Sequence, residues 1–366
     1  NIEIPALARV EGEGALYIRL EDGKINDIEL NIYEPPRFFE GFLQGRFIQE
    51  VPDITARICG ICPVAYQMSS VQAIEKALQV HITPEIRALR RMLYAAEYIE
   101  SHALHIYMLQ APDLLGHDSV LSLADVAPEV VKKALRLKKI GNQLLQAIGG
   151  RSVHPVNACV GGFYRWPRIA AIKSLREDLI WGLEAAKETV RWATTLEFPE
   201  LEIMDYEFVA LTHDEEYAIL EGEILSSREI KIPVEQFEKR YLEQHVKHSN
   251  ALHSHTIDGT PYITGPLSRL NLNYEKLGQE ASEILAEIDI DLPIRNPYKA
   301  LIARAIELVE VYAEAIRLVD SYHPLGPSRM ELTLREGEGM AASEAPRGLL
   351  FHRYIVNSNG SIDHAY

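Results

Sequence analysis

Cysteine is scarce in this sequence of 366 residues, which contains only three. Three thiols leave one unpaired and cannot form a disulfide scaffold, so we expect a reducing compartment, the cytoplasm. Long apolar runs are lacking too: charged residues interrupt every stretch before it approaches the roughly 18 residues that a membrane-spanning helix needs. We therefore expect no membrane insertion by this chain.

Basic residues are also few, 37 Lys and Arg against 53 Asp and Glu, for a net charge of -16. This balance argues against a nucleic-acid partner, because phosphate backbones call for basic surfaces. The first residues, Asn1–Pro5, show no basic stretch leading into an apolar one, so no signal peptide is expected. The sequence has no Rossmann-type glycine loop.

Alternating polarity predicts strands near both ends of the chain, at 15–20, 25–32, 330–334, 349–356 and 361–365. Asp22-Gly23 is typical of a tight hairpin between the first two. Between these ends, apolar residues recur at helical spacing. The predicted helices begin after Pro63 and continue at 84–110, 128–148, 167–196, 234–248, 274–288 and 296–322.

These patterns predict a mainly α fold with a smaller β part (α+β), in which a body of long helices receives β pieces from both terminal regions. We expect an N-terminal β region at 1–62, a helical body at 63–322 with a loop-and-strand insertion near 198–233, and a C-terminal β region at 323–366. Because the sequence stops inside a predicted strand, we expect it to be truncated.

Two of the three cysteines, Cys59 and Cys62, lie two residues apart. This spacing suits half of a metal site, a redox dithiol, or a catalytic cysteine with a helper. A helix beginning near Pro63 is expected to lower their thiol pKa values through its N-terminal dipole. A thioredoxin-like motif would follow a strand in a βαβ unit, and no such unit is predicted here.

A zinc site would need four protein ligands, and no second CxxC pair exists. The densest group of histidines, at 245, 248, 253 and 255, is more simply interpreted as a polar helix end. Cys159 lies in an apolar, glycine-rich stretch and is interpreted as a small buried side chain.

Four further segments, read in order along the chain, distinguish among these interpretations: Arg9-Val10-Glu11-Gly12, Pro36–Gly41 leading into Arg57–Cys62, Gly149–Arg151 with His154–Asn157 and Gly161–Phe163, and Glu344–Gly348. With these motifs the chain resembles the large, catalytic subunit of nickel-iron hydrogenases. It is most similar to the soluble cytoplasmic type that works with NAD(P) or deazaflavin partners. The resemblance spans nearly the whole sequence.

The resemblance implies a nickel-iron centre whose iron carries carbonyl and cyanide ligands. Cys59 would be a terminal nickel thiolate, and Cys62 would bridge nickel and iron. Glu11 would take the proton released when dihydrogen is split. Glu40 would help to hold a magnesium ion.

Three further residues acquire implied roles. Arg347 would lie over the open face of the metals, with Pro346 packing beside it and Asp113 as its partner carboxylate. The implied partners are an iron-sulfur small subunit together with flavin- or nicotinamide-binding subunits of the diaphorase type. The implied reaction is the reversible oxidation of dihydrogen.

The sequence departs from the family in two places. Tyr66 stands where a histidine usually follows the second cysteine, and its hydroxyl is a different hydrogen-bond donor. The closing CxxC of the family has no counterpart, because no cysteine follows Cys159. Two alternatives therefore stay open: a non-catalytic scaffold like the related subunit of respiratory complex I, and a zinc-stabilised helical protein.

Overall fold

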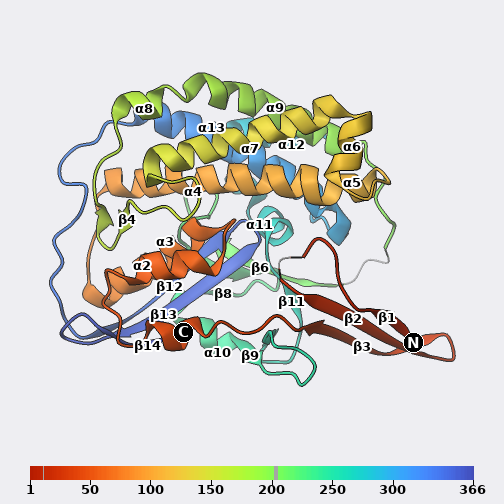
Figure 1. Ribbon diagram of the computed structural model, residues 1–366, viewed down its shortest axis with the longest axis horizontal. Coiled ribbons are helices and arrows are strands. Elements are labelled where there is room, and N and C mark those ends of the chain that lie inside the picture. The colour runs from red at the N-terminus through yellow and green to blue at the C-terminus, as the bar shows by residue number, and fades with distance from the viewer. Residues whose placement is uncertain (11, 202–204) are drawn as a thin grey trace. The chain divides into compact units, whose positions relative to one another are not determined.

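The computed structural model describes residues 1–10, 12–201 and 205–366 (Figure 1). The chain divides into two compact units. The smaller unit consists of Asn1–Phe39 and Gln236–Tyr262, and the larger unit consists of Glu40–Glu235 and Ile263–Tyr366. Two short elements, the 3-10 turn η3 Val234–Gln236 and strand β11 Tyr262–Ile263, lie where the chain passes from one unit to the other.

The smaller unit contains an antiparallel sheet in the order β1-β2-β3, with strands β1 Ile2–Ile4, β2 Gly14–Glu21 and β3 Lys24–Ile32. The turn between β2 and β3 uses positive φ angles at Asp22 (49°) and Gly23 (74°), which suits the Asp-Gly pair. The predicted hairpin is thus confirmed.

The second segment of this unit differs from expectation, because the helix predicted at 234–248 is wrong beyond its first turns. Helix α10 ends at Arg240 (Phe237–Arg240), and β9 Tyr241–Gln244 then pairs antiparallel with β10 His253–Thr256. Tyr241 is buried, whereas the next three residues are exposed. Aromatic residues favour such a half-buried strand. The pairing with β10 could not be predicted from the spacing of apolar residues within 234–248.

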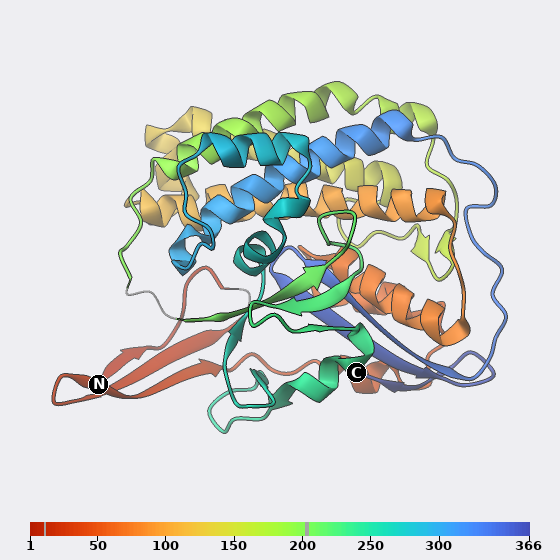
Figure 2. The same ribbon diagram turned by 180° about the vertical axis from the view of Figure 1, so that it is seen from behind.

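Helices make up most of the larger unit, and the long ones α4, α7, α9 and α13 run side by side (Figures 1 and 2). Their bounds are α1 Phe39–Leu43, α2 Val51–Thr55, η1 Ala56–Ile58, α3 Pro63–Leu78, α4 Pro84–Leu104, π-helix η2 His105–Gln110, α5 Ala111–Leu114, α6 Val120–Val126, α7 Pro128–Gly149, α8 Ile169–Lys173, α9 Arg176–Thr194, α11 Pro266–Asn273, η4 Tyr274–Lys276, α12 Gln279–Glu287, η5 Pro297–Lys299 and α13 Ala300–Ser321.

The predicted long helices are confirmed, apart from a break in 167–196 between α8 and α9 and one in 274–288 between η4 and α12. Helix α4 begins where Thr83 accepts a hydrogen bond from the backbone of Ile86, with Pro84 in the first turn. It packs against α7 and α13. A Cβ at Gly141 of α7 would lie 2.8 Å from the carbonyl oxygen of Ala96, so only glycine permits this close packing of α4 and α7.

The strands of the larger unit form three sheets. Their bounds are β4 Ala158–Cys159, β5 Gly162–Phe163, β6 Glu207–Thr212, β7 Glu223–Ser226, β8 Lys231–Ile232, β12 Gly337–Ala345, β13 Gly348–Val356 and β14 Ile362–Ala365. Strand β13 lies between β12 and β14, all antiparallel, and β7 pairs with both β6 and β8. Predicted strands 349–356 and 361–365 are confirmed as β13 and β14.

The strand predicted at 330–334 is wrong, and β12 takes its place a few residues later. The backbone N–H of Met330 donates instead to Gly161. Strand β12 is rich in Gly and Ala, residues of low strand propensity, so the sequence did not indicate it. These small residues are needed because α3 packs directly on β12: a Cβ at Gly339 would lie 1.9 Å from the carbonyl oxygen of Ala73.

The observed mixture of many helices and short sheets confirms the predicted α+β fold class. Among residues 1–10, 12–201 and 205–366, no helix is both long enough and apolar enough to cross a membrane. The main apolar core lies among α3, α4, α7, α9, α11, α12 and α13, and includes Cys62 at the start of α3.

Candidate functional site

The cysteine pair lies between the 3-10 turn η1 and helix α3. Cys59 follows η1 in an extended conformation, and Cys62 directly precedes Pro63, the first residue of α3. The backbone N–H groups of Ile61 and Cys62 point at Cys59 Sγ, at 3.4 and 3.2 Å. Hydrogen bonds of this kind favour a thiolate as the acceptor.

The two sulfurs are close enough for the Cys62 thiol to hydrogen-bond with Cys59. This hydrogen bond, the burial of Cys62 and the negative charge of Glu97 raise the pKa of the Cys62 thiol, whereas Arg347 opposes them. The lowered pKa predicted from the helix dipole is therefore wrong for Cys62, since the second sulfur and burial outweigh the dipole. For both sulfurs to be thiolates at once, a cation would have to lie between them.

The two sulfurs fit part of the ligand set of a nickel-iron group. Thiolates are the soft ligands that such metals prefer, and this pair presents both sulfurs at one place. Elsewhere in the described part of the chain, no group of three or more His, Cys, Asp or Glu side chains is arranged to hold a metal ion. The cysteine pair is thus the candidate metal centre, and it supplies two ligands.

Glu97 of α4 orients the start of α3. Its carboxylate is fully buried and accepts hydrogen bonds from the backbone N–H groups of Val64 (2.6 Å) and Ala65 (3.1 Å). Burial raises the pKa of Glu97 well above its usual value, although the two backbone hydrogen bonds oppose the rise. Sequence reasoning missed this residue, which is one of several charged side chains that α4 buries, among them Arg90 and Arg91.

Arg347 lies in the turn that joins β12 to β13 and donates to Ser101 Oγ of α4 at 3.2 Å. It is near enough to Cys62 to lower the pKa of that thiol. The tertiary structure therefore brings Cys59, Cys62 and Arg347 together, although Arg347 follows Cys62 by most of the sequence. Pro346 precedes Arg347 in the same turn, with its carbonyl accepting from Arg269 at 3.0 Å.

Two other predicted site residues lie on helices that do not carry the cysteine pair. Asp113 lies in α5, just beyond the π-helix, and Glu40 lies in α1; both side chains are exposed in this chain. Glu11 lies outside the described residues. The roles of all three stay predictions.

Tyr66 lies one helical turn after Cys62 in α3. Its ring packs edge-on against His352 of β13, with 6.2 Å between ring centroids. His352 is in turn held by a 2.8 Å hydrogen bond between its Nδ1 and Ser69 Oγ. A histidine from the C-terminal sheet therefore lies beside Tyr66.

Cys159 and the histidines at 245–255 do not belong to the candidate metal centre. Cys159 is 2% exposed, and burial raises its pKa to about 11, which confirms the interpretation as a small buried side chain. The histidines at 245–255 lie around the β9–β10 hairpin rather than on a helix end. The rings of His248 and His253 are 5.5 Å apart there.

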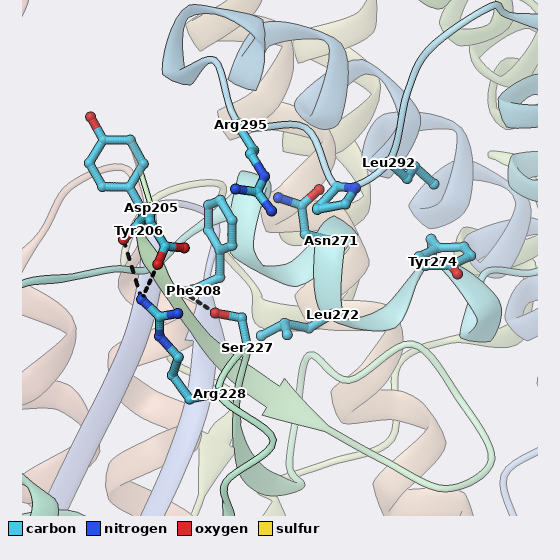
Figure 3. Close-up of a pocket in the computed structure, with 11 residues that line it drawn as sticks. Asp205, Tyr206, Phe208, Ser227, Arg228, Asn271, Leu272, Tyr274, Leu292 and Arg295 are labelled. Atoms are coloured by element: carbon cyan, nitrogen blue, oxygen red, sulfur yellow. Dashed lines mark hydrogen bonds and ion pairs between the residues drawn. The ribbon is translucent and has the colours of Figure 1, made fainter. Parts of the chain in front are cut away.

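A separate cavity of about 360 Å³ lies beside β6 and α11 (Figure 3). Several of its polar groups are already engaged: Arg228 pairs with Asp205 at 2.8 Å, and Ser227 accepts from the backbone of Phe208 at 3.0 Å. It contains no cysteine and none of the predicted site residues. We therefore do not assign the function to this cavity.

Known proteins resemble this chain in sequence. The sequence profile of the family described as nickel-dependent hydrogenase matches residues 37–133, which include the cysteine pair. The alpha subunit of sulfhydrogenase 1 of Pyrococcus furiosus is 34% identical over 368 residues, covering 100% of this chain and 85% of that protein. The F420-non-reducing hydrogenase (vhu) of Methanocaldococcus jannaschii has a subunit that is 33% identical over 390 residues, covering 99% of this chain and 93% of that protein.

Solved structures share the fold. A NAD+-reducing [NiFe]-hydrogenase in the H2-reduced state matches with a TM-score of 0.87 and 22% identity, over 100% of this chain and 87% of that chain. The Ni-Fe-Se hydrogenase of Desulfovibrio vulgaris Hildenborough matches with a TM-score of 0.76 and 21% identity, over 100% and 88%. The fold predicted from the four motifs is thus confirmed.

Proposed function

Since this chain belongs to the nickel-dependent hydrogenase family, we propose that it is the catalytic large subunit of a nickel-iron hydrogenase that splits dihydrogen reversibly and heterolytically. The family and the oxidoreductase class predicted from the motifs are confirmed by these relatives. The observation that carries the site assignment is the pair of adjacent sulfurs of Cys59 and Cys62, within electrostatic range of the Arg347 guanidinium. The scaffold alternative has no comparable support.

Cys59 and Cys62 would hold the metals as thiolates. A nickel-iron centre held there, with carbonyl and cyanide on its iron, would supply the chemistry that binds and splits dihydrogen. The two N–H groups aimed at Cys59 stabilise its negative charge. Glu97, through its hydrogen bonds to the first turn of α3, keeps Cys62 at a constant place.

Glu11 would take the proton that heterolytic cleavage releases, because a carboxylate in a partly dry site can have a pKa suited to proton relay. Arg347 would polarise the bound gas and keep water from the open face, with Pro346 packed beside it and Asp113 as its partner carboxylate. Tyr66 would donate a hydrogen bond near Cys62 where relatives use histidine. A magnesium ion held in part by Glu40 would strengthen the surrounding structure.

The chain would act within a complex. The three free cysteines are two proposed metal ligands and one buried thiol, so electrons would leave through an iron-sulfur small subunit. Subunits that bind flavin or nicotinamide, of the diaphorase type, would complete the path; the matching NAD+-reducing hydrogenase supports this proposal. Three free cysteines support a cytoplasmic location.

Infrared spectroscopy and metal analysis of the complex, purified without oxygen from its host, test the proposal. We expect carbonyl and cyanide stretching bands together with nickel and iron. Cys59→Ser and Cys62→Ser should each lose metal by at least the roughly 10- to 100-fold that outer-sphere ligand changes cause. Cys159→Ser, a matched change at a buried thiol outside the site, should keep both nickel and iron. Full metal content in Cys59→Ser and Cys62→Ser would contradict the site assignment.

A further inference from the structure

Arg269 of α11 is fully buried and uses every donor of its guanidinium group. Its Nε and Nη2 donate to the two oxygens of Glu307 at 2.7 and 2.8 Å. Its Nη1 donates to Glu344 Oε2 at 3.0 Å and to the carbonyl of Ala345 at 2.9 Å, and Nη2 donates to the carbonyl of Pro346 at 3.0 Å. A guanidinium has five N–H donors, so all five are engaged.

Three of these five bonds end on the residues that immediately precede Arg347. Ala345 is the last residue of β12, and Pro346 begins the turn. Backbone carbonyls within such a turn are usually left to water or to nearby loops. Here a buried cation from a different helix binds two successive carbonyls, which holds the path of the backbone into Arg347.

The anchor of Arg269 is itself rigidly held. Glu307 of α13 also accepts from His102 Nε2 at 2.8 Å and from the Tyr217 hydroxyl at 2.7 Å. Burial alone would raise the pKa of Glu307, but the ion pair and hydrogen bonds with Arg269 and the bond with His102 bring it below its usual value. Glu307 therefore stays ionised and fixes the guanidinium plane through a bidentate pair.

The turn is also held from α4 and from the start of α11. The Tyr98 hydroxyl donates to the carbonyl of Glu344 at 2.8 Å, and Arg347 Nη1 donates to Ser101 at 3.2 Å. Gly265, with a φ of +97°, lies so close that a Cβ there would be 2.7 Å from the carbonyl oxygen of Arg347. The backbone on both sides of the Arg347 side chain is thus in contact with fixed elements.

We propose that Arg269 is a positioning residue, which holds the Ala345–Arg347 turn so that the Arg347 guanidinium stays beside the sulfur of Cys62. The proposal rests on the role proposed above for Arg347. Lysine cannot replace this function, because it has no planar fork and too few donors for Glu307, Glu344 and two carbonyls at once.

The test compares Arg269→Lys with Arg90→Lys in the purified complex. Arg90 is a matched control: it is equally buried and makes a bidentate pair at 2.8 and 2.6 Å, but with Glu75 of α3 and not with a residue of the turn. Hydrogen–deuterium exchange of residues 344–350 is measured by mass spectrometry, together with the melting temperature and with kcat and KM for dihydrogen.

We expect Arg269→Lys to speed exchange of 344–350 by about 10- to 100-fold, as expected for lost hydrogen bonds to a charged group. It should also lower kcat by about 10- to 100-fold through displacement of a catalytic group, with little change in KM. Arg90→Lys should lower the melting temperature comparably and leave exchange of 344–350 and kcat near those of the wild type.

Equal exchange of 344–350 in the two variants would overturn the proposal, whatever their activities. If the wild-type complex turned over no dihydrogen, the proposed function would fail, while the exchange comparison would still decide whether Arg269 holds the turn. If Arg269→Lys did not fold, the triple variant Arg269→Met/Glu307→Gln/Glu344→Gln removes the cation and both of its carboxylate partners together, and so avoids an unpaired buried charge. Exchange of 344–350 in that variant is then compared with Arg90→Lys: faster exchange supports the proposal, and equal exchange overturns it.

Discussion

Replacing Gly339 by alanine is the sharpest test of how strand β12 supports the candidate metal centre. Gly339 packs on α3, whose first turn directly follows Cys62. The added Cβ would lie 1.9 Å from the carbonyl oxygen of Ala73 and 2.5 Å from the backbone nitrogen of Ala77. Both are backbone atoms of a helix, so no side-chain rotation can relieve the overlap.

The helix and the strand must therefore separate by more than an ångström. Overpacking in a closely packed core costs about 1–3 kcal/mol and sometimes more. We place Gly339→Ala at the upper end of this range, because the contact is between two backbones. A displacement of α3 also moves Cys62 relative to Arg347, so the nickel content of the purified complex should fall.

The measurement is the thermal unfolding of the complex together with its nickel content. Gly41→Ala serves as the control, since a Cβ at Gly41 of α1 meets no atom within 4 Å. It should change neither quantity appreciably. If Gly339→Ala unfolded at the same temperature as Gly41→Ala and kept its nickel, the close packing of α3 on β12 would be refuted.

Three further predictions concern the larger unit. Glu97→Ala leaves two buried backbone N–H groups without their acceptor, and should lower stability by about 2–4 kcal/mol and reduce nickel content, whereas Glu97→Gln keeps one acceptor and should cost less in both measurements. Thr83→Ala removes the cap of α4 and should cost about 1 kcal/mol in thermal unfolding, with nickel content unchanged. Burial, and next the charge of Glu314, raise the pKa of Glu310 to about 7 from 4.5, so the folded chain binds this proton more tightly than the unfolded chain. The resulting stabilisation, about 3 kcal/mol, is full below pH 4.5 and is lost as the pH rises to 7. Glu310→Gln should remove this dependence, and an unchanged pH profile of the melting temperature would contradict the assignment.

Much of the fold could be predicted from the sequence, because its long helices are coded locally. Apolar residues at helical spacing with a capping Thr83 and Pro84 specify α4 without reference to the rest of the chain. The β2–β3 hairpin is equally local, since Asp22 and Gly23 tolerate the positive φ angles that its turn requires. The cysteine pair, too, could be identified as a candidate site from its spacing and neighbouring motifs.

Other elements depend on contacts that local pattern does not contain. Residues 241–244 form a strand because β10 pairs with them, although their sequence continues a helical pattern. Strand β12 consists of small residues of low strand propensity, and its place is set by β13 on one side and by α3 packed on its surface. For both, the free energy of pairing and packing outweighs intrinsic propensity.

The site divides along the same line. The sequence by itself determined the two thiols, their spacing and the helix that follows them, because these are properties of neighbouring residues. Only the tertiary structure decided what surrounds the thiols: Arg347 beside Cys62, Glu97 at the start of α3, and Arg269 on the turn before Arg347. Such buried charges are stable only where partners from distant segments satisfy them, and those partners meet only when the chain has folded.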